Sequence, residues 1–148
     1  MKLVIHTDGG ARGNPGPAAV GVVIEEEQQS THELHIAAEF GKTIGKTTNN
    51  IAEYTAVIEA LLYLRLHVKS FKSRIDEPLR IDFFLDSTLV VNQLNGLFKV
   101  KDAHLRELLA NARLLEQEIG ERIMYHVIPR EQNRQADLLV NQALDQSL

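Results

Sequence analysis

The sequence predicts an α/β fold in which a mixed β-sheet carries helices on its faces. Two observations lead to this prediction: β-branched, alternating stretches typical of strands, and apolar residues at three- and four-residue spacing typical of helices. They follow one another as three strands, a helix, a strand, two helices, a strand and a helix. Both strand-helix-strand connections can be right-handed crossovers that join parallel neighbours. The expected strands cover residues 2–8, 18–26, 32–41, 79–85 and 122–128, and the expected helices 50–67, 87–94, 103–119 and 134–144.

Turn-forming residues separate the first three strands. The first strand is expected to stop at Gly9 and Gly10, which places Asp8 at its C-terminal end. The segment 12–17 is rich in glycine and proline, and the polar segment 28–31 separates the next two strands. These short connections predict three consecutive antiparallel strands.

The first helix is expected to follow the capping side chains at 47–49. Its apolar stripe comprises Ala56, Val57, Ala60, Leu61 and Leu64. The charged segment 68–78, which contains Asp76, is expected to be a loop. The next strand is closed by Asp86, as the first strand is closed by Asp8.

Glycine and proline mark the ends of the later elements. Gly96 follows the short helix 87–94, and Gly120 follows the helix 103–119. Pro129 interrupts the last strand, and Asn133 is expected to cap the final helix, whose first turn contains Asp137.

Composition limits the functions that are open to this chain. Its 148 residues, 44% of them hydrophobic, suit a single domain over residues 1–148. The absence of cysteine excludes a disulfide framework, a zinc-thiolate site and a thiol nucleophile, so any metal must bind oxygen or histidine. No signal-peptide core follows Met1 and no apolar run approaches membrane-spanning length. We therefore expect a soluble, cytoplasmic protein with no membrane partner, monomeric by default.

The formal net charge of −4 argues against a nucleic-acid binder, because phosphate contacts usually come from a basic surface. If four of the 20 acidic residues form a metal site, however, the other 16 balance the 16 basic residues. Bound divalent cations would then reverse the sign of the charge locally.

Four carboxylates occupy positions that favour a metal site. Asp8 and Asp86 end strands, where ligands of partly parallel sheets usually bind. Glu53 and Asp137 lie in line with apolar helix positions, so they face the core. Burying several ionised carboxylates together is unfavourable unless a cation lies between them, and hard oxygen ligands suit Mg²⁺ or Mn²⁺.

Each carboxylate also has a structural alternative. Asp8 with Gly9 can form a hairpin turn, Glu53 and Asp137 can be first-turn acids that favour the helix dipole, and Asp86 can cap the next helix. The joint placement of the four residues favours the metal site over these separate roles.

Four ordered blocks of the sequence closely resemble type 1 ribonuclease H. They are Thr-Asp-Gly-Gly-Ala-Arg-Gly-Asn-Pro-Gly-Pro at 7–17, Thr-Asn-Asn-Ile-Ala-Glu at 48–53, Leu-Asp-Ser at 85–87 and Asn-Arg-Gln-Ala-Asp at 133–137. The resemblance implies a ribonuclease H-like fold, a five-stranded mixed sheet of order 3-2-1-4-5 with strand 2 antiparallel, flanked by helices. It also implies an endonuclease that hydrolyses the RNA strand of RNA/DNA hybrids.

By this resemblance, the catalytic and metal-binding residues are Asp8, Glu53, Asp86 and Asp137, which hold two Mg²⁺ or Mn²⁺ ions when substrate is bound. Asp8 would bridge both ions, and Glu53 would also lie near a ribose 2′-hydroxyl. One ion activates a water for in-line attack and the other stabilises the departing 3′ oxygen, which leaves 5′-phosphate and 3′-hydroxyl ends.

The ribose 2′-hydroxyl distinguishes RNA from DNA, so recognition needs short polar side chains and backbone groups along the minor groove. Thr48 is expected near a phosphate of the DNA strand, with helix capping as its alternative role. The expected substrate-binding residues are Gly9, Gly10, Gly13, Asn14, Thr48, Asn49 and Asn50.

Two departures from the family pattern identify a form without the flexible histidine loop and the basic protrusion of some members. Residues 125–133 run almost directly into the last helix, so His126 is expected within the final strand. The connection 96–101 leaves only Lys99 and Lys101 in place of the protrusion. Arg130 is either a phosphate contact or a solvated surface group.

Three other functions stay open. A non-catalytic nucleic-acid adaptor would agree with the acidic balance, and the same fold also serves DNA-strand transfer and junction resolution. Double-stranded RNA is a second candidate substrate, because contacts to the 2′-hydroxyl would persist there. The complete carboxylate set favours hydrolysis, and the asparagine-rich blocks favour the hybrid.

Overall fold

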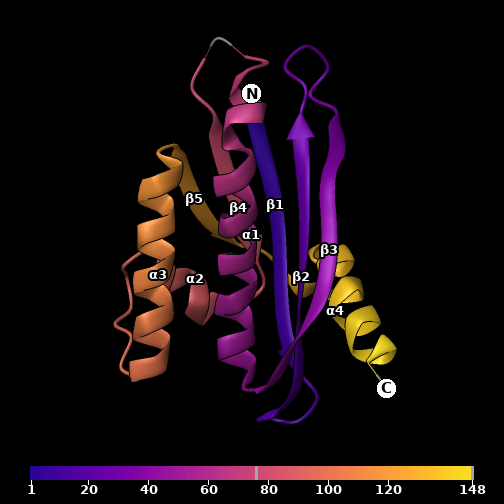
Figure 1. Ribbon diagram of the computed structural model, residues 1–148, viewed down its shortest axis with the longest axis vertical. Coiled ribbons are helices and arrows are strands. Elements are labelled where there is room, and N and C mark those ends of the chain that lie inside the picture. The colour runs from indigo at the N-terminus through magenta and orange to yellow at the C-terminus, as the bar shows by residue number, and fades with distance from the viewer. Residues whose placement is uncertain (76, 148) are drawn as a thin grey trace.

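A five-stranded mixed sheet forms the centre of the computed structural model, which describes residues 1–75 and 77–147. The strand order is β3-β2-β1-β4-β5, antiparallel between β1, β2 and β3 and parallel between β1, β4 and β5 (Figure 1). This confirms the predicted order and the antiparallel second strand. The strands are β1 (Lys2–Ala11), β2 (Gly16–Glu27), β3 (Leu34–Thr47), β4 (Arg80–Leu85) and β5 (Arg122–Val127).

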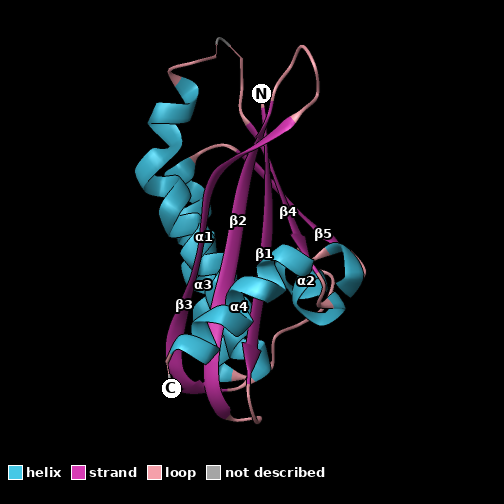
Figure 2. Ribbon diagram, turned by 90° about the vertical axis from the view of Figure 1, so that its right-hand side faces the viewer, coloured by secondary structure: helices cyan, strands magenta, loops and turns pink. Residues whose placement is uncertain are grey.

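Helices pack on both faces of the sheet. On one face α1 lies along β1 and packs against α3, and on the other face α4 crosses β1, β2 and β3 (Figures 1 and 2). A single 3₁₀ turn, η1, precedes α4. The helices are α1 (Asn49–Lys72), α2 (Thr88–Leu94), α3 (Ala103–Ile119), η1 (Arg130–Gln132) and α4 (Arg134–Gln146).

The first and third strands are longer than predicted. β1 does not stop at the glycines but continues to Ala11, with Gly9 opposite Val20 and Gly10 opposite Ala19. β3 likewise continues to Thr47 instead of ending at Gly41. The prediction was wrong because glycine keeps both of its backbone hydrogen-bonding groups and can stay in a paired ladder. Asp8 therefore lies inside β1.

The first helix is also longer than predicted. The expected loop at 68–78 is wrong for its first part, because α1 continues to Lys72. Val68 and Phe71 extend the buried stripe of the helix, while Lys69 and Lys72 point to solvent. The apolar period therefore outweighs the charged composition. Asp76, which was placed in this loop, lies outside the described residues.

Two apolar clusters hold the layers together. The larger one lies between the sheet and the α1–α3 layer and includes Ile5, Leu61 and Phe83, all fully buried. The smaller cluster joins α4 to the sheet and consists of Ala19, Val140, Ala143 and Leu144. Because this second cluster is small, close backbone packing must help to hold α4 in place.

Two glycines allow this close packing. A β-carbon on Gly21 of β2 would overlap the backbone carbonyl of Ala136, and one on Gly41 of β3 would lie 2.5 Å from the carbonyl oxygen of Leu139. The absence of side chains at these positions brings the first turns of α4 against the sheet. The position of Asp137, between Ala136 and Leu139, follows from this contact.

We predict that Gly21→Ala displaces α4 and lowers the free energy of unfolding by about 1–3 kcal/mol, as overpacking usually does. Gly10→Ala is the matched control, because the nearest atom to its new β-carbon would be Val140 Cγ1 at an ordinary 3.8 Å. Urea unfolding followed by circular dichroism measures both variants. Equal stability of the two variants would contradict the close-packing role of Gly21.

Candidate active site

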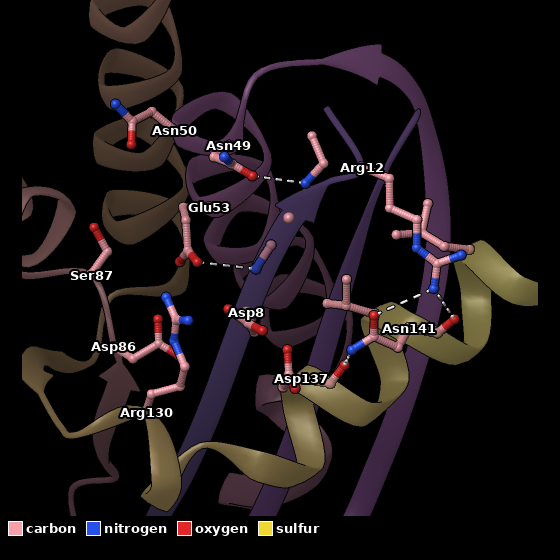
Figure 3. A pocket seen from close by; sticks show the side chains of 15 residues that line it. Asp8, Arg12, Asn49, Asn50, Glu53, Asp86, Ser87, Arg130, Asp137 and Asn141 are labelled. Atoms are coloured by element: carbon pink, nitrogen blue, oxygen red, sulfur yellow. Dashed lines mark hydrogen bonds between the residues drawn. The ribbon is translucent and has the colours of Figure 1, made fainter. Parts of the chain in front are cut away.

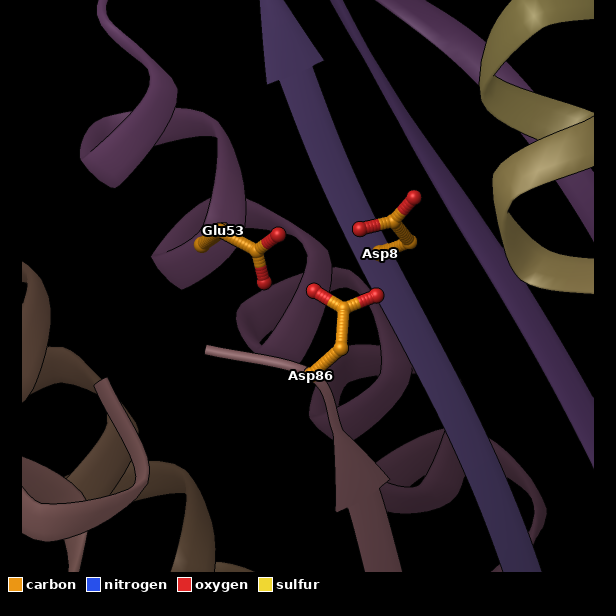
Figure 4. A group of neighbouring side chains, drawn as sticks. All are labelled: Asp8, Glu53 and Asp86. Atoms are coloured by element: carbon orange, nitrogen blue, oxygen red, sulfur yellow. The ribbon is translucent and has the colours of Figure 1, made fainter. Parts of the chain in front are cut away.

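Three carboxylates from separate elements meet at one side of the sheet. Asp8 lies on β1 and Asp86 directly follows β4, whose parallel pairing with β1 ends at His6 and Phe84. Glu53 reaches the same point from α1. One carboxylate oxygen of each residue lies within 4.8 Å of those of the other two (Figure 4).

A glycine on β1 allows α1 to bring Glu53 this close. A β-carbon on Gly9 would overlap the backbone carbonyl of Ala52, the residue before Glu53. The backbone N–H of Gly9 also donates to Glu53 Oε1 at 3.3 Å. The approach of the helix therefore requires a glycine at this position, and the backbone N–H of the same residue orients the carboxylate.

Burial dominates the electrostatics of this site. Asp8 and Glu53 are each only 7% exposed. The pKa of Asp8 is raised to about 7, mainly by burial; the neighbouring Glu53 carboxyl acts in the opposite direction, and the charges of Asp86 and Asp137 add to the increase. Burial, followed by the charge of Asp8, raises the pKa of Glu53 well above its ordinary value. Without a cation, the site therefore holds protons at neutral pH.

The carboxylate oxygens fit a divalent cation. Glu53 Oε2 is buried and has no hydrogen-bond partner among the described residues, so an oxygen atom is left for a ligand at the centre of the group. Oxygen ligands are what Mg²⁺ and Mn²⁺ prefer, and a cation would compensate the mutual repulsion of the carboxylates.

Asp137 occupies the open side of the site. It lies in the first turn of α4, is exposed, and faces Asp8 across the cleft (Figure 3). Its charge contributes to the raised pKa of Asp8, yet it lies outside the three-carboxylate group. Of the four predicted ligands, the structure brings three into direct proximity and places the fourth beside them.

Asn133 has a role that the sequence did not predict. It was expected to cap α4, but its side chain makes no capping hydrogen bond. Instead its amide nitrogen donates to the carbonyl of Thr7 at 2.9 Å and to Asp86 Oδ2 at 3.1 Å, and the residue is 1% exposed. Asn133 thus ties β1, Asp86 and α4 together. The one indication of this role in the sequence was that Asn133 belongs to the same motif block, residues 133–137, as Asp137.

The structural alternatives for three carboxylates do not match their positions. Glu53 is not in the first turn of α1, so it is not a first-turn acid. Asp8 pairs with Gly21 inside β1, so it is not part of a hairpin turn. The capping side chain of α2 is that of Ser87, which accepts from the N–H of Val90 at 3.2 Å, and not that of Asp86.

A cleft of about 400 Å³ surrounds the carboxylates. Of the predicted substrate contacts, Gly9, Gly10, Asn49 and Asn50 line it, together with Arg12, Ser87 and Arg130 (Figure 3). Arg130, which the sequence placed either at phosphate or in solvent, is exposed at the rim of this cleft.

The other three predicted contacts, Gly13, Asn14 and Thr48, lie outside the cleft lining. Thr48 Oγ1 accepts from the N–H of Ile51 at 3.3 Å, which confirms its capping role. Asn14 Oδ1 accepts from the N–H of Asn49 at 3.0 Å, and Asn49 Oδ1 accepts from the N–H of Ala11 at 2.9 Å. These bonds join the turn after β1 to the start of α1. The substrate contacts stay a prediction.

The two departures from the family pattern have structural counterparts. His126 lies within β5, as expected, and its Nε2 is 2.9 Å from Asp82 Oδ1. Only residues 95–102 connect α2 to α3, so the basic protrusion has no room there.

The sequence matches the model of the reverse transcriptase-like family over residues 6–143. It is 41% identical over 144 residues to ribonuclease HI of Halobacterium salinarum, covering 97% of this chain and 65% of that protein. It is 38% identical to a bifunctional protein of Mycobacterium tuberculosis, of which it spans 36%. The chain thus covers about a third of the mycobacterial relative and less than two thirds of the halobacterial one.

Solved structures share the fold over nearly their whole length. LC11-RNase H1 in complex with an RNA/DNA hybrid has a TM-score of 0.83 and 40% identity, covering 98% of both chains. RNase H1 of Halobacterium salinarum has a TM-score of 0.82 and 38% identity, covering 99% of both chains. In the described part of this chain, no helix is long and apolar enough to cross a membrane.

The mixed sheet, its strand order and the carboxylate group beside its central strands β1 and β4 define a ribonuclease H-like α/β domain. The chain belongs to the reverse transcriptase-like family and, within it, to the type 1 ribonucleases H.

The raised pKa values predict a dependence of stability on pH. Between about pH 4 and about pH 7, the folded metal-free protein binds more protons than the unfolded chain, so its stability falls as the pH rises through this window. Urea unfolding in chelator measures this decline. Asp8→Asn should make it shallower and millimolar Mg²⁺ should suppress it, whereas the control Glu107→Gln, at an exposed carboxylate on α3, should not change it. A wild-type protein that gains stability over this window would contradict the assignment.

Asn133→Ala should lower the free energy of unfolding by about 1–3 kcal/mol, because the buried Thr7 carbonyl loses its partner. Divalent-cation affinity, measured by calorimetry, should fall as well, since Asp86 is no longer held. Gln135→Ala, at an exposed position two residues further on, is the control and should alter neither quantity. Unchanged cation affinity in a folded Asn133→Ala protein would rule out the positioning role.

Proposed function

We propose that this protein is an endonuclease that hydrolyses the RNA strand of RNA/DNA hybrids with divalent metal ions, leaving 5′-phosphate and 3′-hydroxyl ends. The observation that carries this proposal is the group formed by Asp8, Glu53 and Asp86, whose oxygens lie within 4.8 Å of one another around the unpartnered Glu53 Oε2. Relatives of similar sequence are named ribonuclease H, and one similar structure holds an RNA/DNA hybrid.

Asp8, Glu53, Asp86 and Asp137 would hold two ions, Mg²⁺ or Mn²⁺. When bound, such ions supply an activated water and a stabilised leaving oxygen for phosphodiester hydrolysis. Asp8 is central in the group, since it interacts with Glu53, Asp86 and Asp137, which supports its role as the shared ligand. The exposure of Asp137 supports a looser ligand that reaches the site from α4.

The residues around the carboxylates would select and orient the hybrid. Glycine backbone and asparagine side chains line the cleft next to Glu53, where contacts to a ribose 2′-hydroxyl are expected. Asn49 and Asn50 are exposed there, and Gly9 and Gly10 leave the backbone accessible. Arg130 at the rim can contact a phosphate of the RNA strand. The hybrid would also be contacted beside the cleft by Gly13, Asn14 and Thr48.

This function is proposed for the described domain as a single, monomeric unit, with a cytoplasmic location. Residues 1–75 and 77–147 share one sheet with helices on both of its faces, which supports a single domain.

The adaptor alternative is disfavoured because an adaptor has no need for a repulsive, buried carboxylate group. Double-stranded RNA is a second substrate to test, because it offers the same 2′-hydroxyl groups.

The proposal predicts cleavage of labelled RNA/DNA hybrid with Mg²⁺ or Mn²⁺ and none with chelator. Asp8→Asn should lower the rate by at least about 1000-fold, equivalent to about 4 kcal/mol of transition-state stabilisation. Asp137→Asn should lower it less, since Asp137 lies outside the three-carboxylate group. Electrophoresis of end-labelled products measures the rate and the end chemistry.

Matched substrates and a matched variant complete this experiment. RNA duplex and DNA duplex of the same sequence test the selectivity, and Glu107→Gln, which removes an exposed carboxylate on α3, should keep the wild-type rate. Cleavage of the DNA duplex at the rate of the hybrid would overturn the proposed substrate. A folded protein that cuts nothing with either metal would favour the adaptor.

A further inference from the structure

A large part of one sheet face carries no helix. α4 crosses β1, β2 and β3 only near the candidate active site, and Figure 2 shows the other halves of β1, β4 and β5 uncovered among the described residues. The parallel register of these strands aligns their outward side chains in three rows. We call this surface the open sheet face. Its first row consists of Lys2, Arg80 and Arg122, its second row of Val4, Asp82 and Met124, and its third row of His6, Phe84 and His126.

The open sheet face has a surplus of positive charge. Asp82 is 1% exposed and is contacted by Arg80 Nε at 3.0 Å, His126 Nε2 at 2.9 Å and Lys2 Nζ at 3.7 Å. Arg122 lies opposite Arg80 in the next strand, so this part of the face carries three permanent cations and one carboxylate. Because the chain as a whole has a net charge of −4, this local surplus stands against the overall balance. A basic patch of this kind attracts phosphate groups.

A stack of rings lies between this basic row and the candidate active site. The rings of His6 and Phe84 lie 5.3 Å apart at 23°, and those of Phe84 and His126 lie 5.0 Å apart at 26°. β5 is the edge strand, so the stack ends at His126, whose side chain is 34% exposed. A planar aromatic group can extend the stack on that outer side. Nucleobases stack on aromatic side chains in this way.

The charges also define a direction along the face. On β2, next to Lys2 and Val4, lie Glu27 and Glu25, which would repel phosphates from that half of the sheet. Asp86 of the candidate active site directly follows β4 and lies six residues after Arg80, a span on the order of 20 Å along a strand. A phosphodiester chain that leaves the site can therefore follow β4 and β5 to the basic row.

We propose that the open sheet face binds a single-stranded flank of the nucleic acid whose duplex part occupies the candidate active site. Lys2, Arg80 and Arg122 contact its phosphates, and one base stacks on His126. The continuity with the active site rests on the proposed function, whereas single-strand binding itself requires no catalysis. An acidic peptide would match the cations but leave the ring stack unused, and for that reason we favour nucleic acid.

Binding is tested with a fluorescent oligothymidylate of roughly 12 nucleotides, a length within the usual range of single-strand sites, by anisotropy in chelator. Arg122→Glu should weaken binding at low salt about 10-fold and lower the slope of log affinity against log salt by roughly 0.7, one phosphate contact. Lys69→Glu makes the same charge change on α1, behind the sheet, and should bind like the wild type. Equal affinity of the two variants, or equal displacement by polyglutamate and unlabelled oligonucleotide, would overturn the proposal.

The stacking contact has its own test. His126→Phe keeps a ring at the end of the stack and should retain affinity, whereas His126→Ala should lose about 5-fold or more, the effect of one lost base stack. Circular dichroism checks that both variants fold, and Arg122→Glu tests the face independently of them. Equal affinities of the Phe and Ala variants would remove the stacking contact from the proposal.

Hydrolysis by the wild type separates this proposal from the proposed function. If blunt hybrid is cut but the oligonucleotide does not bind, the open sheet face has no such role and the proposed function stands. If the oligonucleotide binds as predicted but blunt hybrid is not cut, the proposed function fails and the binding face stands. With both present, a single-stranded overhang should lower KM for the hybrid, and Arg122→Glu should abolish that difference.

Discussion

The mutual repulsion of Asp8, Glu53 and Asp86 is the constraint on which the rest of the structure depends. The three carboxylates come from β1, from α1 and from the residue after β4, and one oxygen of each lies within 4.8 Å of those of the other two. Because Gly9 has no side chain, α1 can pack directly against β1, and the backbone N–H of Gly9 donates a hydrogen bond to Glu53. Asn133 holds Asp86 from the side of α4. The fold thus stores an unfavourable charge arrangement that a divalent cation can relieve.

The two faces of the sheet are covered by helices to different extents. The face under α1 and α3 carries the large apolar cluster, and it holds the strands in register. The face under α4 has only a small cluster and two close glycine contacts, so half of it stays open. That incomplete cover leaves the cleft accessible to a long ligand and exposes the basic row beyond it. A protein with a net negative charge can therefore expose the basic row of Lys2, Arg80 and Arg122 on the same sheet face as its carboxylate group.

The elements whose type was predicted correctly are those with a clear period. The bounds predicted for the helix at 103–119 are correct; Gly120, which the prediction used, adopts the left-handed conformation that ends the helix, and the structure adds Asp102 as its N-terminal cap. The lengths of β1 and α1 were wrong, because glycines and lysines suggested breaks where pairing and burial continue. Asn133 was wrongly predicted to cap α4, because capping can be inferred from neighbouring residues. Its actual partners, Thr7 and Asp86, are distant in the sequence.

The sequence by itself determined the order of the elements, the four carboxylates and the family resemblance, because periodicity, turn residues and motif blocks are all local properties of the chain. The tertiary structure decided how these residues act together. The register between β1 and β4 places Asp8 beside Asp86, and the packing of α1 on β1 at Gly9 helps to bury Glu53, whose pKa is raised by that burial. The stack of His6, Phe84 and His126 likewise arises from three strands that are remote in the sequence. Burial and charge coupling depend on distances through space, which no local pattern specifies.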